Sequence, residues 1–404
     1  AVVEYAYAPD ASYVVYRADA DTVGQNELYR YTISPAARFK LSTTLQANGN
    51  VTDFEISPNV ANANIVYRAD YTVDNRFELL SVPAIGGPSI LVSGSPVTGR
   101  DASRPKFSLN GNRIFFRSNR DDANKTELFR VQVDGTALTK IGDINAASGS
   151  VNANYELTPD GNRIVFLADR ITTGLKELYS VVVNTGVITR ISFASPESTT
   201  KFAISPDGAY VVFLIGNLSA GANMLSSVPV AGGVTVWPRI SPEMTGATSS
   251  IIDFSISPDS QRVVFRGDAE IEGQIELWSS PIRAATPTSG VRPVRLSSSM
   301  ASGSNVSYFV NSPVGDQVIF RADRESPGVH ELWRTPLTGG GPALDIDGNG
   351  ELDAATDGLL ISRWLLGFRG SALVDSAVAT SGAVRNTAPL IEAYLSALTG
   401  MVSP

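Results

Sequence analysis

The chain has 404 residues, of which 43% are hydrophobic and 18% charged, and its net charge is −8. Because nucleic acids and anionic membranes bind to basic surfaces, neither is a good candidate partner. Cysteine is absent, which excludes disulfides, thiolate metal sites and cysteine nucleophiles, and the single histidine, His330, excludes a mechanism with two imidazoles. Cations are better candidates for binding.

No apolar run approaches the roughly 18–20 residues that span a membrane. The first residues, AVVEYAYAPD, alternate as a strand does, without the charged segment and apolar stretch of an export signal. We therefore expect no membrane span and, if the protein is exported, its mature form.

One pattern repeats seven times with a period of about 50 residues, beginning near residues 2, 51, 101, 151, 200, 250 and 305. Each copy has a turn, in most copies Ser/Thr-Pro with Asp, Asn or Gly at the next positions, as in TPDG at 158–161 and SPDG at 205–208. A β-branched or aromatic strand follows the turn, for example YVVYRAD or RVVFRGD. After a polar loop comes a third strand, for example NELYRYT or IELWSSP, and a weaker apolar segment closes most copies.

Short strands with turns at fixed offsets and no helical period predict an all-β fold. About four strands per copy, repeated seven times, indicate a seven-bladed β-propeller. The repeat, as in ISPDGAYVVF, resembles the TolB-like propellers over residues 1–337. That resemblance implies the fold and little about activity, since the family includes binding modules, scaffolds and domains attached to enzymes.

The repeat carries three polar positions. An arginine ends the second strand, an acid or amide follows two residues later, and a glutamate opens the third strand: Arg17, Arg68, Arg117, Arg266, Arg321; Asp19, Asp70, Asn119, Asp169, Asp268, Asp323; Glu27, Glu78, Glu127, Glu177, Glu276, Glu331. We expect the arginine and the glutamate to meet across their loop. The set is either a ring of ligand-binding groups or one loop-anchoring network per blade. The fifth copy favours the second interpretation, because Leu214, Gly216 and Met224 replace all three groups together.

The last copy lacks a fourth apolar segment, because its third strand, ELWRTPL, runs directly into TGGGPA. An unpaired strand edge promotes association unless it is covered. We expect the C-terminal module or another chain to cover this edge.

After a glycine-rich hinge at 338–342, the stretch LDIDGNGELDAATDGLL has the spacing of a calcium loop. The candidate ligands lie at positions 1, 3, 5, 7 and 9, with Gly350 at the sharp turn of position 6: Asp345, Asp347, Asn349, Glu351, Asp353. Position 12 should be a bidentate acid but is Thr356, and Asp357 follows one residue later. Either the loop is one residue longer or Asp357 binds through water.

Two helices should follow, one over DGLLISRWLLG and one from near Pro389 with a helical apolar stripe. A calcium loop, a helix ending in LLGFRG and a terminal helix resemble the dockerin-like modules of exported bacterial proteins. This resemblance covers about 343–400 and implies a calcium-binding helical domain over 343–404. Dockerins carry two such loops, whereas LVDSAVATSGAVRNTAP has only one acid, Asp375. We therefore predict one calcium site and an extracellular or cell-surface location.

The sequence has no nucleophile elbow and no marked pair of acids for glycoside hydrolysis. The first hypothesis is a secreted, non-enzymatic propeller that attaches or self-associates through its calcium module and the open edge of the last blade, and that polymerises into fibres. The alternative is a glycan-binding or carbohydrate-active propeller anchored by the module. Four glycosylation sequons are present, at Asn50, Asn124, Asn217 and Asn305.

Overall fold

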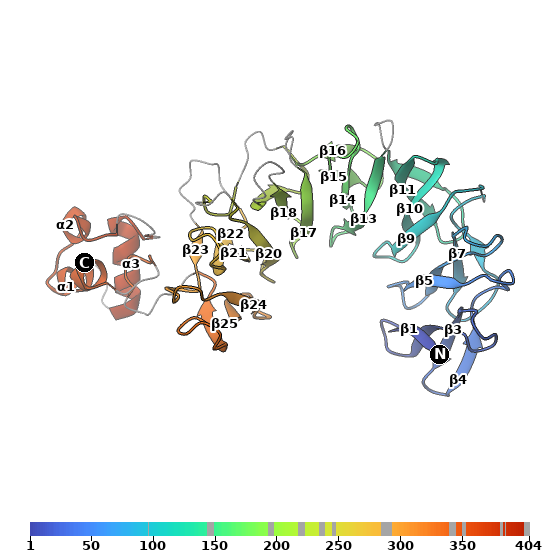
Figure 1. The fold of residues 1–404 in the computed structure, drawn as a ribbon, viewed down its shortest axis with the longest axis horizontal. Coiled ribbons are helices and arrows are strands. Elements are labelled where there is room, and N and C mark those ends of the chain that lie inside the picture. Colours follow the sequence, from blue (N-terminus) through green and yellow to red (C-terminus); the bar gives the residue numbers. More distant parts are fainter. Residues whose placement is uncertain are drawn as a thin grey trace. The chain divides into compact units, whose positions relative to one another are not determined.

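The computed structural model describes residues 1–404 except 96, 144–148, 193–197, 217–222, 234–238, 245–247, 284–292, 339–344, 350–352, 380–382, 384 and 400–404, and the side chains of 397–399. The chain forms two compact units, Ala1–Ser192 and Phe193–Pro404. Each is described by itself below (Figure 1).

The first unit contains four antiparallel meanders of four strands each. The first two are β1 (Val2–Tyr7), β2 (Tyr13–Ala18), β3 (Glu27–Thr32), β4 (Ala37–Lys40), and β5 (Val51–Ile56), β6 (Asn64–Ala69), β7 (Glu78–Pro83), β8 (Ile90–Leu91). The next two are β9 (Ala102–Phe107), β10 (Arg113–Asp122), β11 (Lys125–Gln132), β12 (Thr139–Gly142), and β13 (Gly149–Leu157), β14 (Arg163–Ala168), β15 (Glu177–Val182), β16 (Ile188–Arg190). A short parallel pairing of β11 with β13 joins these last two meanders into one sheet.

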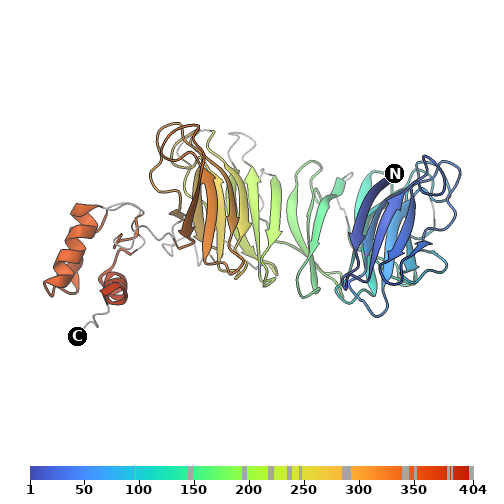
Figure 2. The same ribbon diagram turned by 90° about the horizontal axis from the view of Figure 1, so that it is seen from below.

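The second unit contains three more meanders and the C-terminal module. The fifth is β17 (Thr199–Ile204), β18 (Tyr210–Gly216), β19 (Asn223–Pro229); the sixth is β20 (Ile251–Ile256), β21 (Arg262–Gly267), β22 (Glu276–Pro281), β23 (Val294–Arg295); the seventh is β24 (Val306–Asn311), β25 (Gln317–Ala322), β26 (Glu331–Pro336). In Figure 2 the strands of each meander lie side by side. The prediction of an all-β repeat built like propeller blades is therefore confirmed for the β region.

Adjacent meanders within a unit pack face to face. Val66 and Leu79, from the second and third strands of the second meander, are fully buried against Ile114 and Phe116 of the third. The sixth and seventh meanders pack in the same way, with Val264 and Leu277 against Val318 and Phe320. Alternation of apolar residues in the sequence therefore places one set of side chains on each face, and the core lies between the sheets.

The Ser-Pro-Asp-Gly turns connect the first and second strands through the hydrogen bonds that their sequence predicts. In the fifth meander Gly208 N donates to Ser205 O at 2.8 Å, and Asp207 Oδ1 accepts from Ala209 N at 3.0 Å. Gly208 has a φ of 72°, a conformation that glycine adopts without strain. The turn therefore fixes where the second strand begins.

The seventh meander has three strands, and within the described part of the chain β26 pairs with β25 alone. This is the open edge that the sequence predicts. The fifth meander also has three strands, but an isolated bridge between Ser226 and Arg239 marks its fourth segment.

The C-terminal module contains the π-helix η1 (Ala354–Gly358) and the helices α1 (Leu359–Leu365), α2 (Ser371–Val374) and α3 (Ala388–Thr399). Its core is formed by residues from the loop and all three α-helices: Ile346, Leu360, Trp364, Leu373, Ala377, Ile391, Leu395. The two predicted helices are present, and α2 is an addition that the sequence pattern did not indicate. Among the described residues, no helix has the length and apolar character needed to cross a bilayer.

Candidate metal site and the repeated polar network

The acidic loop brings three carboxylates together. Asp345, Asp347 and Asp357 are all fully buried, and ligand atoms from each lie within 4.8 Å of one another. The first two come from the loop that precedes η1, and the third comes from η1 itself.

The π-helix η1 explains why Asp357 takes part and Thr356 does not. Gly358 N donates to Asp353 O at 3.1 Å, a bond five residues back that accommodates one extra residue in the turn. The carboxylate of Asp357 therefore reaches the acidic cluster, whereas the buried Thr356 hydroxyl has no hydrogen-bond partner. Of the two open alternatives, the geometry favours a loop that is one residue longer.

Backbone amides hold Asp357 in place. Its Oδ1 accepts from Ile346 N (2.6 Å) and Asp347 N (3.2 Å), and its Oδ2 accepts from Asp353 N (2.9 Å). Each carboxylate oxygen has two lone pairs, so these bonds orient the group and leave acceptor capacity for a cation. Asp345 Oδ1 is oriented likewise by Gly348 N at 2.8 Å.

The surroundings of Asp347 disfavour its ionised form. Burial raises the pKa of Asp347, and the charge of Asp357 raises it further, while Arg385 lowers it. The Arg385 guanidinium donates to the main-chain oxygen of Ile346 (2.7 Å) and to that of Asp345 at 2.5 Å. Arg385 thus clamps the loop backbone, a role that no spacing in the sequence indicated.

The other predicted ligands lie less centrally. Asn349 is half-buried and its backbone N–H donates to Asp347 Oδ1 at 3.1 Å. Asp353 is exposed, and its Oδ1 caps η1 by accepting from Ala355 N at 2.7 Å. Glu351 lies outside the described residues. The structure thus brings together three of the six predicted side chains, which are Asp345, Asp347 and Asp357.

In the repeats, the aspartates anchor loops. Asp268 Oδ1 accepts from Ser250 N (2.6 Å) and its Oδ2 accepts from Gly273 N (2.9 Å). Asp323 makes the equivalent two bonds in the seventh meander. Each aspartate ties the residue before the first strand to the loop before the third, as the loop-anchoring interpretation predicts.

The repeat glutamates do not meet the arginines, so that prediction is wrong. Ala18 is the cross-strand partner of Glu27, so Arg17, one residue earlier, projects from the opposite face of the sheet. There its Nη1 donates to Val51 O of the next meander at 2.7 Å. The arginine therefore links neighbouring sheets.

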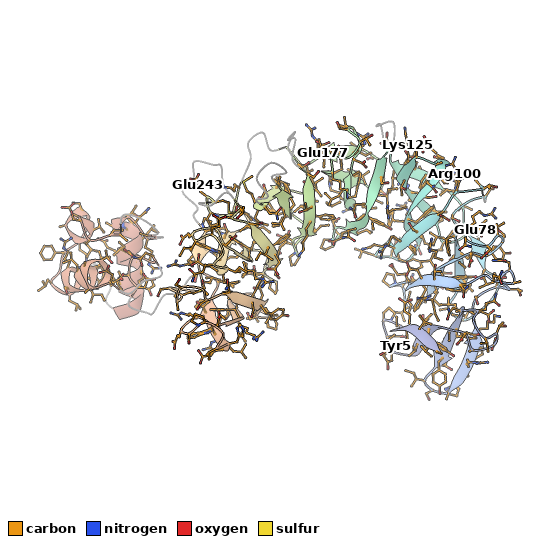
Figure 3. All side chains as sticks on the ribbon, viewed as in Figure 1. Tyr5, Glu78, Arg100, Lys125, Glu177 and Glu243 are labelled. Carbon is orange, nitrogen blue, oxygen red and sulfur yellow. The ribbon has the colours of Figure 1, made fainter. Side chains whose placement is uncertain are left out.

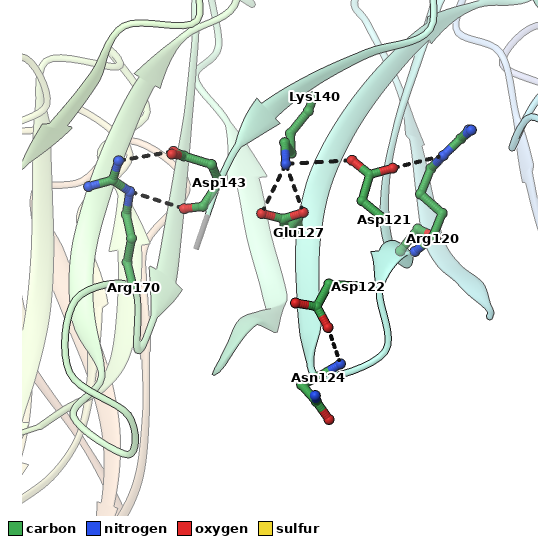
Figure 4. A network of polar contacts seen from close by, with 9 residues as sticks. Arg120, Asp121, Asp122, Asn124, Glu127, Lys140, Asp143 and Arg170 are labelled. Carbon is green, nitrogen blue, oxygen red and sulfur yellow. Dashed lines mark hydrogen bonds and ion pairs between the residues drawn. The ribbon is translucent and has the colours of Figure 1, made fainter. Parts of the chain in front are cut away.

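Five of the six repeat glutamates instead bind cations, and in four of these pairs the cation comes from the fourth segment. Lys140 Nζ lies 3.1 Å from Glu127 Oε2 (Figure 4), and Arg190 Nη1 lies 3.0 Å from Glu177 Oε1. Glu78, labelled with Glu177 in Figure 3, has no basic residue in its fourth segment and binds Arg76 at 2.9 Å instead.

Two of the sequon asparagines have structural roles. Asn50 Oδ1 accepts from Asn26 N and Asn305 Oδ1 accepts from Ile275 N, each at 2.8 Å. A glycan would attach to Nδ2, which donates to Asn48 O in Asn50 (2.9 Å) and to Gly303 O in Asn305 (3.1 Å). Asn217 lies outside the described residues.

A polar pocket of about 370 Å³ opens on the first unit. It is lined by the first strands of the first three meanders and the second strands of the first two: Glu4, Arg17, Thr52, Asp53, Arg68, Ser103, Arg104. Burial raises the pKa of Asp53, and the neighbouring Glu4 raises it further. Glu4 forms an ion pair with Arg17 at 2.7 Å, so Glu4 and Asp53 are not two acids that are both available for catalysis.

No family model and no curated protein matches this chain. Among solved structures, it is similar to TolB from Acinetobacter baumannii, with 15% identity, 67% of this chain and 61% of that chain covered, and a TM-score of 0.36. It is also similar to an oligogalacturonate lyase from Vibrio parahaemolyticus (14%, 82% and 88%, 0.42) and to a prolyl endopeptidase (12%, 85% and 51%, 0.46). The chain thus spans about three fifths of that TolB and half of the peptidase. Similarity at this level indicates no shared activity, and the fold rests on the sheets described above.

Proposed function

We propose that this protein is a non-enzymatic, exported bacterial propeller protein that attaches or self-associates through a calcium-stabilised C-terminal module. Its seven meanders are the blades of one propeller, and the module is dockerin-like. Protein contacts made by the module and by the open edge of the seventh blade build an extracellular fibre. A closing heterologous contact would give a ring, whereas a non-closing one gives a filament.

The observation that carries this proposal is the burial of three carboxylates within 4.8 Å of one another. Like charges at this separation oppose ionisation unless a cation compensates them. The Arg385 guanidinium donates to main-chain carbonyls of the loop. A bound cation would compensate the three charges and hold the loop against η1.

The donor set fits calcium. The three buried side chains offer only oxygen atoms, and neither cysteine nor histidine takes part. Calcium takes six to eight oxygens in flexible geometry, whereas magnesium keeps several waters and softer metals prefer nitrogen or sulfur. At a free concentration 100 times its Kd, calcium would stabilise the module by about 2.7 kcal/mol. Millimolar calcium outside cells provides this excess for a Kd of about 10 μM.

The test compares two aspartates of one loop. Asp357→Asn should abolish calcium binding measured by isothermal titration calorimetry and remove the calcium-dependent rise in Tm. Asp353→Asn, which changes an exposed helix cap, should retain binding within about tenfold. Equal effects of the two variants would contradict the proposed site.

Assembly is tested on the same proteins. Negative-stain electron microscopy and light scattering should show filaments or oligomers of the wild type in calcium, and their loss after chelation or in Asp357→Asn. Monodisperse monomers of the wild type under both conditions would contradict the assembly function.

A second candidate is a glycan-binding or carbohydrate-active propeller anchored by the module. The polar pocket with Asp53 favours it, because a carboxyl with a raised pKa in a concave site is a candidate proton donor. The ion pair of Glu4 with Arg17 weakens it as a hydrolase. A panel of polysaccharides, scored for binding and for new reducing ends, separates the candidates, and Asp53→Asn assigns any activity to the pocket.

A further inference from the structure

The fourth segments of the meanders share a short motif of a basic residue, Leu or Ile, and Ser or Gly. It occurs at 40–42 (KLS), 140–142 (KIG), 190–192 (RIS), 239–241 (RIS) and 295–297 (RLS). The second meander has LVS at 91–93, without the basic residue. No other part of the printed sequence contains the full motif.

The second and third motif residues complete the edge of the third strand. In the sixth meander Leu296 N donates to Leu277 O at 2.7 Å, and Ser297 Oγ accepts from Leu277 N at 3.3 Å. The first meander repeats these bonds between Leu41, Ser42 and Leu28 at 2.8 and 3.1 Å. In these two meanders the motif therefore provides hydrogen-bond partners for both the N–H and the C=O of the leucine in the third strand. The aliphatic side chain of the motif is buried.

The basic residue neutralises the buried glutamate of the third strand. Arg295 Nη1 lies 3.2 Å from Glu276 Oε1, and Glu276 is only 1% exposed. In the register of this sheet Arg295 lies opposite Trp278, two residues after the glutamate. Lys140 and Arg190 hold the same place opposite Phe129 and Tyr179.

Departures from the motif are compensated within their own meander. Where the second meander lacks the basic residue, Arg76 binds Glu78. Where the fifth lacks the glutamate, Arg239 turns to Glu243 at 2.9 Å. A third-strand glutamate is therefore paired with a cation in five of the six meanders that have a fourth segment, and in the fifth, which lacks that glutamate, the cation pairs with another acid.

The seventh meander has the receiving half of this arrangement alone. Glu331 opens β26 and is exposed, with no ion pair in the described part of the chain. Val329, at the place equivalent to Arg76, supplies no charge. The sequence after Pro336 has no basic–aliphatic–Ser/Gly motif.

We infer that the open edge of β26 binds an extended segment of another polypeptide that carries Lys or Arg, then Leu or Ile, then Ser or Gly. The segment adds as an antiparallel fourth strand, with its basic residue opposite Trp333 and paired with Glu331. The N–H of its aliphatic residue donates to the C=O of Leu332, and where the third residue is Ser, its Oγ accepts from the N–H of Leu332. This inference rests on the proposed function, because it gives the chemistry of the partner at the open edge.

The five motifs in this chain are all engaged in their own meanders, which favours a segment from outside these 404 residues over a second copy. Charge complementarity with Glu331 determines that the first motif residue of the bound segment is basic. Main-chain pairing with β26 determines that the segment runs antiparallel. Both can be tested separately.

The test uses a fluorescent peptide copying residues 293–299 (PVRLSSS) and the full chain, with binding followed by fluorescence anisotropy. The peptide should bind saturably, and changing its Arg to Glu should weaken binding at least about tenfold. The Glu331→Lys variant should no longer bind the peptide with Arg, and it should bind the peptide in which Arg is changed to Glu. Glu325→Lys, an equal charge change at an exposed loop position, should leave binding of the Arg peptide unchanged.

Hydrogen exchange should show new protection confined to 331–336 when the peptide is bound. No saturable binding, or binding that is insensitive to Glu331→Lys, overturns the inference. So does self-association through β26 that the peptide cannot compete with, because a second copy would then fill the edge. Peptide binding should persist in Asp357→Asn, so this inference and the calcium proposal fail independently.

Discussion

The sixth and seventh meanders have nearly the same second and third strands in sequence, RVVFRGD with IELWSSP and QVIFRAD with HELWRTP. Both place a glutamate at the start of the third strand and an aspartate in the loop before it. In the sixth the glutamate is buried against Arg295, whereas in the seventh Glu331 is exposed. The fourth segment, and not the strand that carries the glutamate, therefore decides its environment.

The comparison also separates two roles within one polar signature. The aspartate is bonded identically in both meanders, because its partners are backbone amides of the same meander. The glutamate depends on a neighbour that one meander lacks. A repeated residue thus has a conserved role only where its partner is repeated too.

The largest expected difference concerns the aliphatic residue of the fourth segment. Leu296 is buried in the core between the sixth and seventh meanders, so Leu296→Ala should cost about 2–4 kcal/mol in unfolding free energy. Val329→Ala, at an exposed loop position of the seventh meander, should change it by less than about 0.5 kcal/mol. Urea unfolding measures both, and similar midpoints would show that the fourth segment adds no core.

The second prediction removes the cation from one glutamate. Arg295→Ala leaves Glu276 buried without its partner and should cost about 1–3 kcal/mol. Glu331→Ala should be neutral within about 0.5 kcal/mol, because that side chain is exposed. A large cost at Glu331 would mean that a cation already covers it.

The repeat could be predicted well from the sequence because seven copies show the same order of turns and strands. Seven turns and seven β-branched strands at one period are hard to produce without the same meander. It failed for the Arg17 and Glu27 pair, because two residues that are close along a hairpin can still lie on opposite faces. Only the register, with Ala18 opposite Glu27, decides that.

For the metal loop, the sequence left a different point of geometry undetermined. The period-two spacing indicated which residues could bind an ion, but the extra residue before Asp357 could be absorbed in more than one way. The bond of Gly358 N to Asp353 O shows that a π-turn absorbs it. Arg385 comes from a segment that no motif connected with the loop, since only tertiary packing brings it there.

The third prediction concerns pH. Burial raises the pKa of Glu276 from 4.5 to about 7, with Arg295 opposing the shift. Between these values the folded state keeps a proton that the unfolded state releases, so stability should fall as pH rises, by at most about 1.4 kcal/mol per pH unit. Glu276→Gln should flatten that slope in urea unfolding from pH 4.5 to 7. A slope that Glu276→Gln leaves unchanged would contradict this assignment.

The smallest expected difference is between the two loop aspartates. Asp268 and Asp323 each accept two backbone N–H bonds, and those from Gly328 and Asn305 lower the pKa of Asp323. Asp268→Ala and Asp323→Ala should therefore destabilise the chain by similar amounts, about 1–3 kcal/mol each. Each substitution leaves two equivalent backbone N–H groups without their hydrogen-bond acceptor. For Asp323 the sign is that of a lowered carboxyl pKa: its contribution is present at neutral pH and is lost as pH falls through the folded-state value. A much smaller cost for Asp323→Ala would show that the open edge loosens the whole seventh meander, whereas equal costs confine the difference between the two meanders to the missing fourth strand.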